Sequence, residues 1–392
     1  MMKNLRRFLS IFCMFALSIT LISCGNRERK SLSERANELN AQNQESLNSV
    51  TEASIVEPAT EPAIASGSSL DIAKEDTHEG ETRSLLTGEW IDDKYEGKRP
   101  YAFMFNNIQY AYPQCGTGRA GIMYEILAEG GITRLMGVFD YMKGDRIGSA
   151  RSARHYYVDF ANEFNAIYIH YGQTKYATAE IQKLGVDEIS GLAAEGNYVF
   201  YRDNNIPAPH NAFATAAGIK KAVKNKKIST KLKDGVGAHF NFAYDEEVDN
   251  KMEGSKRATD IKLPFSAYMT PEFTYSKKSG RYTRHAFGTI HKDLSTGKAL
   301  TFTNLFVQFV NEYNIDKKGY QTMDLMNNTG SGYYITKGRA VKVYWKKGNA
   351  ESRTIFYYDK AFTDEVKVNT GKTYYAVFPD NRADMITFTS KS

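Results

Sequence analysis

The placement of aromatic residues decides which part of this chain can fold. Residues 25–86 contain no Phe, Trp or Tyr, and they are rich in Asn, Glu, Ser, Ala, Thr and Gln. Such a composition buries too little apolar surface to offset the conformational entropy that is lost when a chain becomes ordered. We therefore expect residues 25–86 to form a disordered stalk, and a folded body to begin at residue 87, where aromatic residues become frequent.

The first 24 residues have the layout of a secretory signal. A short basic region is followed by an apolar run from Phe8 to Ile22, which is too short to span a membrane comfortably. The run ends in Leu-Ile-Ser-Cys, which resembles the lipobox of bacterial lipoproteins. This resemblance implies that residues 1–24 are a lipoprotein signal peptide, and that a lipid on Cys24 anchors the chain to the extracytoplasmic face of the cell membrane. The alternatives are an uncleaved membrane anchor and an ordinary signal peptide.

The folded body is more basic than the net charge of +6 suggests. Acidic residues outnumber basic ones in the predicted stalk, so the excess of Lys and Arg falls on residues 87–392. A basic body on a Gram-positive type of cell surface would gather on polyanions, such as teichoic acids and anionic lipid headgroups. The alternative is that the charge only keeps the body soluble. No motif that reads RNA or DNA accompanies it, so we expect no nucleic acid partner.

The pattern of apolar residues divides the body into two parts. Over residues 87–250, short apolar runs alternate with helical periodicity, which predicts an α/β domain with a mixed sheet and flanking helices. Over residues 258–390, helical periodicity disappears, and short β-rich runs are separated by Gly and polar turns. This second pattern predicts a mainly antiparallel β domain.

Four arginines surround one predicted strand and the start of the helix that follows it. They are Arg134, Arg146, Arg151 and Arg154, and Ser152 is the expected N-cap of the helix. A helix N-terminus presents free N–H groups and a partial positive charge, and guanidinium groups grip anions in bidentate fashion. The pattern favours a phosphate or carboxylate site. The alternative is that these arginines pair with nearby carboxylates and brace the fold.

Further polar residues are expected at the same rim of the sheet. His170 and Arg202 each lie at the end of a predicted strand, and His210 and Asn211 lie on a loop stiffened by proline. In open α/β sheets, ligands bind at the carboxyl ends of the strands. We therefore expect Arg202 and Asn211 to contribute to ligand binding. The two histidines are candidates for a general acid or base.

Several motifs, spread over both parts of the body, carry a family resemblance. They include Glu129-Gly-Gly-Ile-Thr-Arg134, Ile147-Gly-Ser-Ala-Arg-Ser-Ala-Arg154, His170-Tyr-Gly172, Ala208-Pro-His-Asn211 and Gly288-Thr-Ile-His291. The chain resembles the YerB-like lipoproteins of Gram-positive bacteria over roughly residues 85–385. The resemblance implies an α/β N-terminal domain, a β C-terminal domain and a cell-envelope location. It supplies no activity, because both halves are domains of unknown function. Where the family usually has Gly-Pro-Val-Arg-Ser, this chain has Gly-Ser-Ala-Arg-Ser from residue 148.

Three functions agree with these patterns. The first is a lipid-anchored envelope protein whose arginine rim holds an anionic wall or lipid-linked ligand, such as teichoic acid or peptidoglycan. The second is a hydrolase or transferase that acts on a phosphate-linked envelope polymer, with Glu125 and Glu129 as its catalytic carboxylates. The third is a structural partner for cell-wall enzymes. We expect no cofactor and no bound metal, because none of the usual ligand or nucleotide motifs is present.

The lipobox makes the first testable prediction. The Cys24→Ser variant should stay unlipidated, because the thiol that receives the lipid is absent. Cells grown with a clickable fatty acid should label the parent chain and leave the variant unlabelled. Equal labelling of the two chains would contradict the lipobox interpretation.

Overall fold

A computed structural model describes residues 77–243, 251, 252 and 254–389 of the chain. The predicted signal peptide, Cys24 and most of the predicted stalk lie outside these residues. None of the helices in the described part of the chain is long and apolar enough to cross a membrane.

The body is built on one mixed sheet of eleven strands, which receives strands from both predicted domains. From one edge to the other, ten of them follow the order β12-β22-β21-β18-β25-β4-β5-β3-β7-β8, and β23 pairs with β22. The N-terminal part supplies β3 (Tyr101–Asn107), β4 (Ile122–Leu127), β5 (Thr133–Phe139), β7 (Ile167–His170) and β8 (Glu188–Ser190). The C-terminal part supplies β12 (Lys256–Arg257), β18 (Asn304–Val310), β21 (Asn328–Thr336), β22 (Arg339–Lys347), β23 (Ile355–Tyr357) and β25 (Thr373–Pro379).

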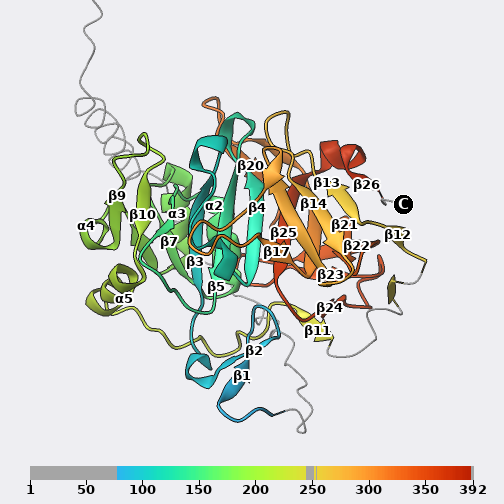
Figure 1. Cartoon of the computed structure of the whole chain (residues 1–392), viewed down its shortest axis with the longest axis horizontal. Helices are drawn as coiled ribbons and strands as arrows, with labels where there is room; N and C mark the ends of the chain where they lie inside the picture. The colour runs from blue at the N-terminus through green and yellow to red at the C-terminus, as the bar shows by residue number, and fades with distance from the viewer. Residues whose placement is uncertain (1–76, 244–250, 253, 390–392) are drawn as a thin grey trace, which may run out of the picture. The chain divides into compact units, whose positions relative to one another are not determined.

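The two parts meet where β25 pairs with β4 in parallel, from Thr373 opposite Ile122 to Val377 opposite Ile126. Figure 1 shows the N-terminal strands and helices on the left and the C-terminal strands on the right, with β4 and β25 between them.

Each face of this sheet carries its own apolar core, because side chains alternate along a strand. Tyr375 points to the face that α2 (His155–Glu163) and α3 (Lys175–Leu184) cover, and its neighbour Tyr374 points to the opposite face. On the first face, Phe160 of α2 packs on Tyr124 at 4.8 Å between ring centroids. We call this the α2 face.

The opposite face is covered by α5 (Ala216–Asn225) and by a second sheet. This sheet has six strands and is antiparallel throughout. Its strands are β13 (Asp260–Lys262), β14 (Glu272–Ser276), β15 (Arg281–Ala286), β16 (Thr289–Ile290), β17 (Thr301–Phe302) and β26 (Thr387–Thr389). Phe273 of β14 packs on Tyr374 of the central sheet at 4.6 Å between ring centroids. We call this the β14 face.

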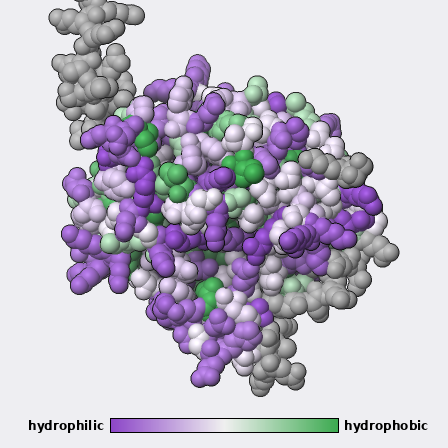
Figure 2. All heavy atoms as spheres, in the orientation of Figure 1, coloured by the Kyte–Doolittle hydropathy of each residue, from purple (hydrophilic) through white to green (hydrophobic). Residues whose placement is uncertain are grey.

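Smaller elements complete the body. A three-stranded sheet consists of β6 (Ile147–Gly148), β9 (Phe200–Arg202) and β10 (Ala212–Ala214), and the short helix α4 (Gly196–Val199) leads directly into β9. Three two-stranded sheets pair β1 (Glu81–Arg83) with β2 (Trp90–Asp92), β11 (Asn241–Ala243) with β24 (Lys367–Asn369), and β19 (Glu312–Asn314) with β20 (Gln321–Met323). The visible surface in Figure 2 is mostly hydrophilic, as expected when the apolar residues lie between the layers.

The predicted fold class is confirmed in both parts, with two local corrections. The ordered chain starts earlier than residue 87, because β1 pairs with β2 and the guanidinium of Arg83 stacks on Trp90 at 3.9 Å. The helix predicted from Ser152 begins later, because Arg154 is the N-cap of α2 and the hydroxyl of Ser152 donates to the carbonyl oxygen of Tyr171.

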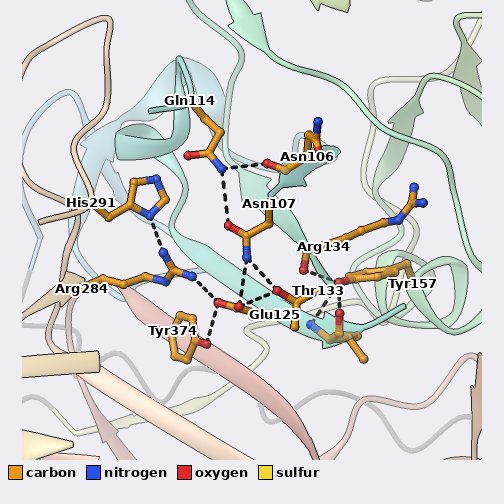
Figure 3. Close-up of polar contacts among 11 residues, drawn as sticks. Asn106, Asn107, Gln114, Glu125, Thr133, Arg134, Tyr157, Arg284, His291 and Tyr374 are labelled. Carbon is orange, nitrogen blue, oxygen red and sulfur yellow. Dashed lines mark hydrogen bonds and ion pairs between the residues drawn. The ribbon is translucent and has the colours of Figure 1, made fainter. Parts of the chain in front are cut away.

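A buried ionic network joins the two parts beneath the β25–β4 pairing (Figure 3). Nη2 of Arg284, on β15, donates to Oε2 of Glu125, on β4, at 2.6 Å, and both side chains are fully buried. The hydroxyl of Tyr374 donates to the same carboxylate at 2.9 Å, and Asn107 and Thr133 donate to its other oxygen. Every carboxylate oxygen of Glu125 is therefore hydrogen-bonded, which a buried charge requires.

This network predicts a large cost for losing one partner. Arg284→Met should lower the free energy of unfolding by roughly 3–5 kcal/mol, because it leaves the Glu125 carboxylate buried without its cation. Adding Glu125→Gln should recover part of that loss, since the amide removes the stranded charge. Denaturant titration measures both effects.

The matched control is Lys262→Met, which breaks an ion pair with Glu272 whose two side chains are 57% and 44% exposed. It should cost less than about 1 kcal/mol. Equal stability of Arg284→Met and Lys262→Met would contradict the importance of the buried pair.

Candidate functional site

The candidate site lies at the rim of the central sheet where several strands end, on the α2 face. The parallel strands β3 and β7 end at this rim, and the antiparallel strand β5 begins there. The segment after β6 runs beside β3. The backbone N–H of Asn106 donates to the carbonyl oxygen of Ser149, and the backbone N–H of Arg151 donates to the carbonyl oxygen of Met104. Residues that lie opposite one another share a face. Asn106 lies opposite Arg134, so the side chains of Arg134, Asn106, Ser149 and Arg151 fall on the α2 face.

Arg154 lies above this row as the N-cap of α2. Its guanidinium forms a bidentate ion pair with the carboxylate of Glu129, with Nε at 2.7 Å from Oε1. Nη1 donates to the carbonyl oxygen of Ala153 at 2.8 Å. The charge of Arg154 is thus compensated by one carboxylate. This agrees, for Arg154, with the alternative that the arginines pair with nearby carboxylates and brace the fold.

Arg134 is different, because it is only 7% exposed and forms no ion pair with any carboxylate in the described part of the chain. Nη1 donates to the carbonyl oxygen of Ser152 at 2.6 Å, while Nε is buried without a hydrogen-bond partner. Burial, together with the charges of Arg154 and Arg151, lowers the pKa of Arg134 to about 9. The group stays cationic at neutral pH, so a charge is held in the interior without a counterion.

Arg151 is a second cation on this face without a carboxylate partner among the described residues, and it is less buried than Arg134. Nη2 of Arg151 donates to Nδ1 of His210 at 3.0 Å, and the amide of Asn106 donates to the same nitrogen at 2.9 Å. Burial, Arg154 and Arg202 lower the pKa of Arg151 to about 10. Two donors at Nδ1 require an unprotonated nitrogen, and burial and Arg151 lower the pKa of His210 accordingly.

Arg202 and Asn211 lie at the outer side of this group. Nη1 of Arg202 donates to Oδ1 of Asn211 at 2.7 Å, and its guanidinium stacks on Tyr171 at 4.8 Å. Arg202 is exposed. The structure therefore brings together most of the residues predicted for the site. These are Arg134, Arg151, Arg154, Arg202, His210, Asn211 and Glu129, which we call the arginine cluster.

Three predicted site residues have other positions. Arg146 pairs with Asp203 at 2.7 Å and stacks on Phe213, with no contact to Arg134 or Arg154. Glu125 points to the β14 face, away from Arg134, and is used in the buried network (Figure 3). Neighbouring residues of a strand point to opposite faces of the sheet. The sequence pattern around Glu125 did not show to which face its side chain points.

His170 is the third. It is fully buried, with Nε2 at 2.6 Å from Glu188 and Nδ1 at 2.9 Å from the carbonyl oxygen of Gly172. Both ring nitrogens face groups of the protein, so neither one is open to a ligand. This geometry favours a structural role for His170 over the predicted role in acid–base chemistry.

Two residues of the site were missed in the sequence. The hydroxyl groups of Ser149 and Tyr168 are buried, and neither has a hydrogen-bond partner among the residues that the structure describes. Tyr168 lies on the α2 face, and the charges of Arg134 and Arg154 act on its phenol. Burial raises the pKa of Tyr168 well above its usual value, so the phenol stays protonated and can donate. The sequence gave no signal for these two residues, because burial without a hydrogen-bond partner can be recognised only in three dimensions.

No group of three or more His, Cys, Asp or Glu is placed to hold a metal ion among residues 77–243, 251, 252 and 254–389. The arginine cluster is instead rich in donors. Together with the hydroxyls of Ser149 and Tyr168 and the start of α2, its guanidinium groups suit an anion.

Comparison with known proteins gives the family. Residues 86–229 match the N-terminal domain of a protein family of unknown function, DUF3048, and residues 261–375 match its C-terminal domain. The chain belongs to the DUF3048 family. The N-terminal match contains the whole arginine cluster, and the C-terminal match contains Arg284.

A curated relative and a solved structure agree with this assignment. The chain is 30% identical over 305 residues to the Bacillus subtilis (strain 168) protein named "Putative lipoprotein YerB". The aligned region covers 76% of this chain and 86% of the relative. The crystal structure of YerB from Bacillus subtilis matches with a TM-score of 0.69 at 27% identity, over 79% of this chain and 100% of that one. The resemblance to YerB-like lipoproteins is thereby confirmed.

The Glu129–Arg154 pair predicts a pH dependence of stability. Burial alone would raise the pKa of Glu129, but the hydrogen bonds and charge of Arg154 outweigh it and lower the pKa below 4.5. The stabilisation is therefore fully present above about pH 4.5 and is lost as the pH falls through the lowered value. Glu129→Gln should cost roughly 1.5–3 kcal/mol at pH 7 and much less at pH 3.

Urea titration of parent and variant at the two pH values measures this difference. Glu272→Gln, which removes an exposed carboxylate, is the control and should have little effect at either pH. A cost of Glu129→Gln that is the same at pH 3 as at pH 7 would exclude an ionic contribution from the pair.

Proposed function

We propose that this chain is a lipoprotein of the cell envelope, anchored to the extracytoplasmic face of the membrane through a lipid on Cys24. The apolar run that ends in Leu-Ile-Ser-Cys supports this, and so does the name of the relative, which describes a lipoprotein. On this proposal the arginine cluster binds an anionic, phosphate-bearing ligand of the wall or the membrane. Teichoic acid, peptidoglycan and wall enzymes are the partners that such a location offers.

The observation that carries the binding proposal is the unpaired guanidinium of Arg134. An isolated buried charge is costly, and proteins ordinarily compensate it with a carboxylate or with hydrogen bonds at every donor. Here Nε of Arg134 has neither. Glu129, the nearby carboxylate whose charge acts on Arg134, is already bound to Arg154. A bound anion would supply the missing counterion and the missing acceptor together.

The neighbouring groups strengthen the same interpretation. Arg151 is a second cation without a carboxylate partner among the described residues, and it lies on the same face as Arg134. The N–H groups of His155 and Tyr156, in the first turn of α2, are used in no hydrogen bond of the described chain. Helix N–H groups and unpaired guanidiniums together form a common protein site for phosphate.

The binding proposal predicts a selective effect of two arginines. Calorimetric titration of the mature chain with inorganic pyrophosphate should give binding that Arg134→Met weakens about tenfold or more. Loss of one charge-assisted contact costs about 1.5–3 kcal/mol, and 1.4 kcal/mol is a factor of ten. Arg151→Gln, at the less buried position, should weaken binding in the same way without threatening the fold.

Arg146→Met is the matched control, because it removes an equal charge from an arginine that is paired with Asp203 outside the cluster. It should leave pyrophosphate affinity within twofold of the parent. Equal losses in Arg134→Met and Arg146→Met would indicate general charge attraction and would contradict a site at the cluster.

A further inference from the structure

The donors of the candidate site, which are those of the arginine cluster together with Ser149 and Tyr168, are arranged by depth. Ser149 is 1% exposed and Arg134 and Arg154 are each 7% exposed, while Arg151 is half-buried and Arg202 is exposed. The candidate site thus has an inner group and an outer group. The inner group contains the atoms that lack partners, and the outer group consists of arginines already held by His210 and Asn211.

Three inner atoms are available to donate to a ligand. They are Nε of Arg134 and the hydroxyl oxygens of Ser149 and Tyr168, each buried and without a hydrogen-bond partner in the described part of the chain. All three side chains belong to the α2 face of the sheet. The N–H group of a guanidinium only donates, and hydroxyl groups also donate readily to an anion. Arg134 and Ser149 lie on either side of Asn106, and the charge of Arg134 acts on the phenol of Tyr168, so the three groups belong to one region of this face. They suit a ligand group that carries several acceptor oxygens.

The number of free oxygens distinguishes two kinds of phosphate. A terminal phosphoryl group has three free oxygens and one substituent, so it can reach buried donors with its substituent directed to solvent. A phosphodiester has only two free oxygens and two substituents, and one substituent would have to be buried with it. A diester could reach the inner donors only by burying its second substituent among the side chains of the α2 face, whereas an end-on phosphoryl group keeps its single substituent outside.

We propose that the arginine cluster binds a terminal phosphoryl group end-on and discriminates against a phosphodiester within a chain. This inference rests on the proposed function and narrows its ligand to a phosphomonoester or the end of a pyrophosphate. The three inner atoms take the terminal phosphoryl oxygens. Arg151 and Arg202, at the outer side, take the next charged group of the ligand.

The test compares glycerol 3-phosphate, a monoester, with glycerophosphoglycerol, a diester, on the mature chain. At pH 5 both ligands carry close to one negative charge, because the second pKa of a phosphomonoester is about 6. The comparison at this pH therefore measures the effect of the second substituent rather than of charge. The monoester should bind at least tenfold more tightly at pH 5, and more tightly still at pH 7.5.

Ser149→Ala identifies the inner group as the source of the preference. It removes one buried hydroxyl and should weaken the monoester several-fold while leaving any diester binding unchanged. Thr274→Ala, a half-buried hydroxyl on β14, is the control and should change neither.

The possible outcomes separate the two proposals. Equal affinity for monoester and diester, or equal losses of both in Ser149→Ala, would overturn end-on recognition. The binding proposal would stand in that case if pyrophosphate binding still depended on Arg134. Absence of binding for all three ligands would overturn both proposals.

Discussion

The buried ion pair of Glu125 and Arg284 links strands of the N-terminal and C-terminal parts of the body. It lies beneath the parallel pairing of β25 with β4, where two stretches of chain some 250 residues apart in sequence enter one sheet. A buried carboxylate is tolerated only when each oxygen has a partner, and Glu125 draws its partners from β3, β5, β15 and β25. These four strands are thereby fixed relative to one another. The rim of the sheet at which β3 and β7 end and β5 begins depends on that geometry, and the arginine cluster lies at this rim.

The deep cations of the body show how unusual Arg134 is. Arg284 is paired with Glu125, and Lys347 is paired with Glu163 at 2.5 Å, with all four side chains fully buried. Both pairs follow the rule that a buried charge is compensated within the protein. Arg134, on the other face of the strands that hold Glu125, does not follow it. Sites where a protein breaks such a rule are expected to be functional or strained.

Much of the fold could be predicted from the sequence, because period-two and helical patterns are local. The strand at Thr133–Phe139 and the change to β structure after residue 258 were both visible in this way. The joining of both parts in one sheet was not visible. It depends on the pairing of β25 with β4, and no local pattern specifies which strands pair across such a distance.

The sequence likewise predicted only part of the candidate site. The spacing of Arg134, Arg151 and Arg154 around a strand and a helix start indicated a cluster, and the structure brings the three together. Arg146 has the same spacing signal but pairs with Asp203, because β6 turns its side chain toward β10. Ser149 matters only through its burial and its missing partner. Such properties belong to tertiary structure and leave no trace in composition or spacing.

On the proposed function, the guanidinium of Arg134 lacks a protein counterion because it holds a phosphate. A crystal structure of the mature chain grown with glycerol 3-phosphate would show this contact. We expect a phosphoryl oxygen about 2.7–3.2 Å from Nε of Arg134, with the glycerol directed toward Arg202. A structure at saturating ligand in which Nε of Arg134 contacts a carboxylate of the protein, or water alone, would contradict it.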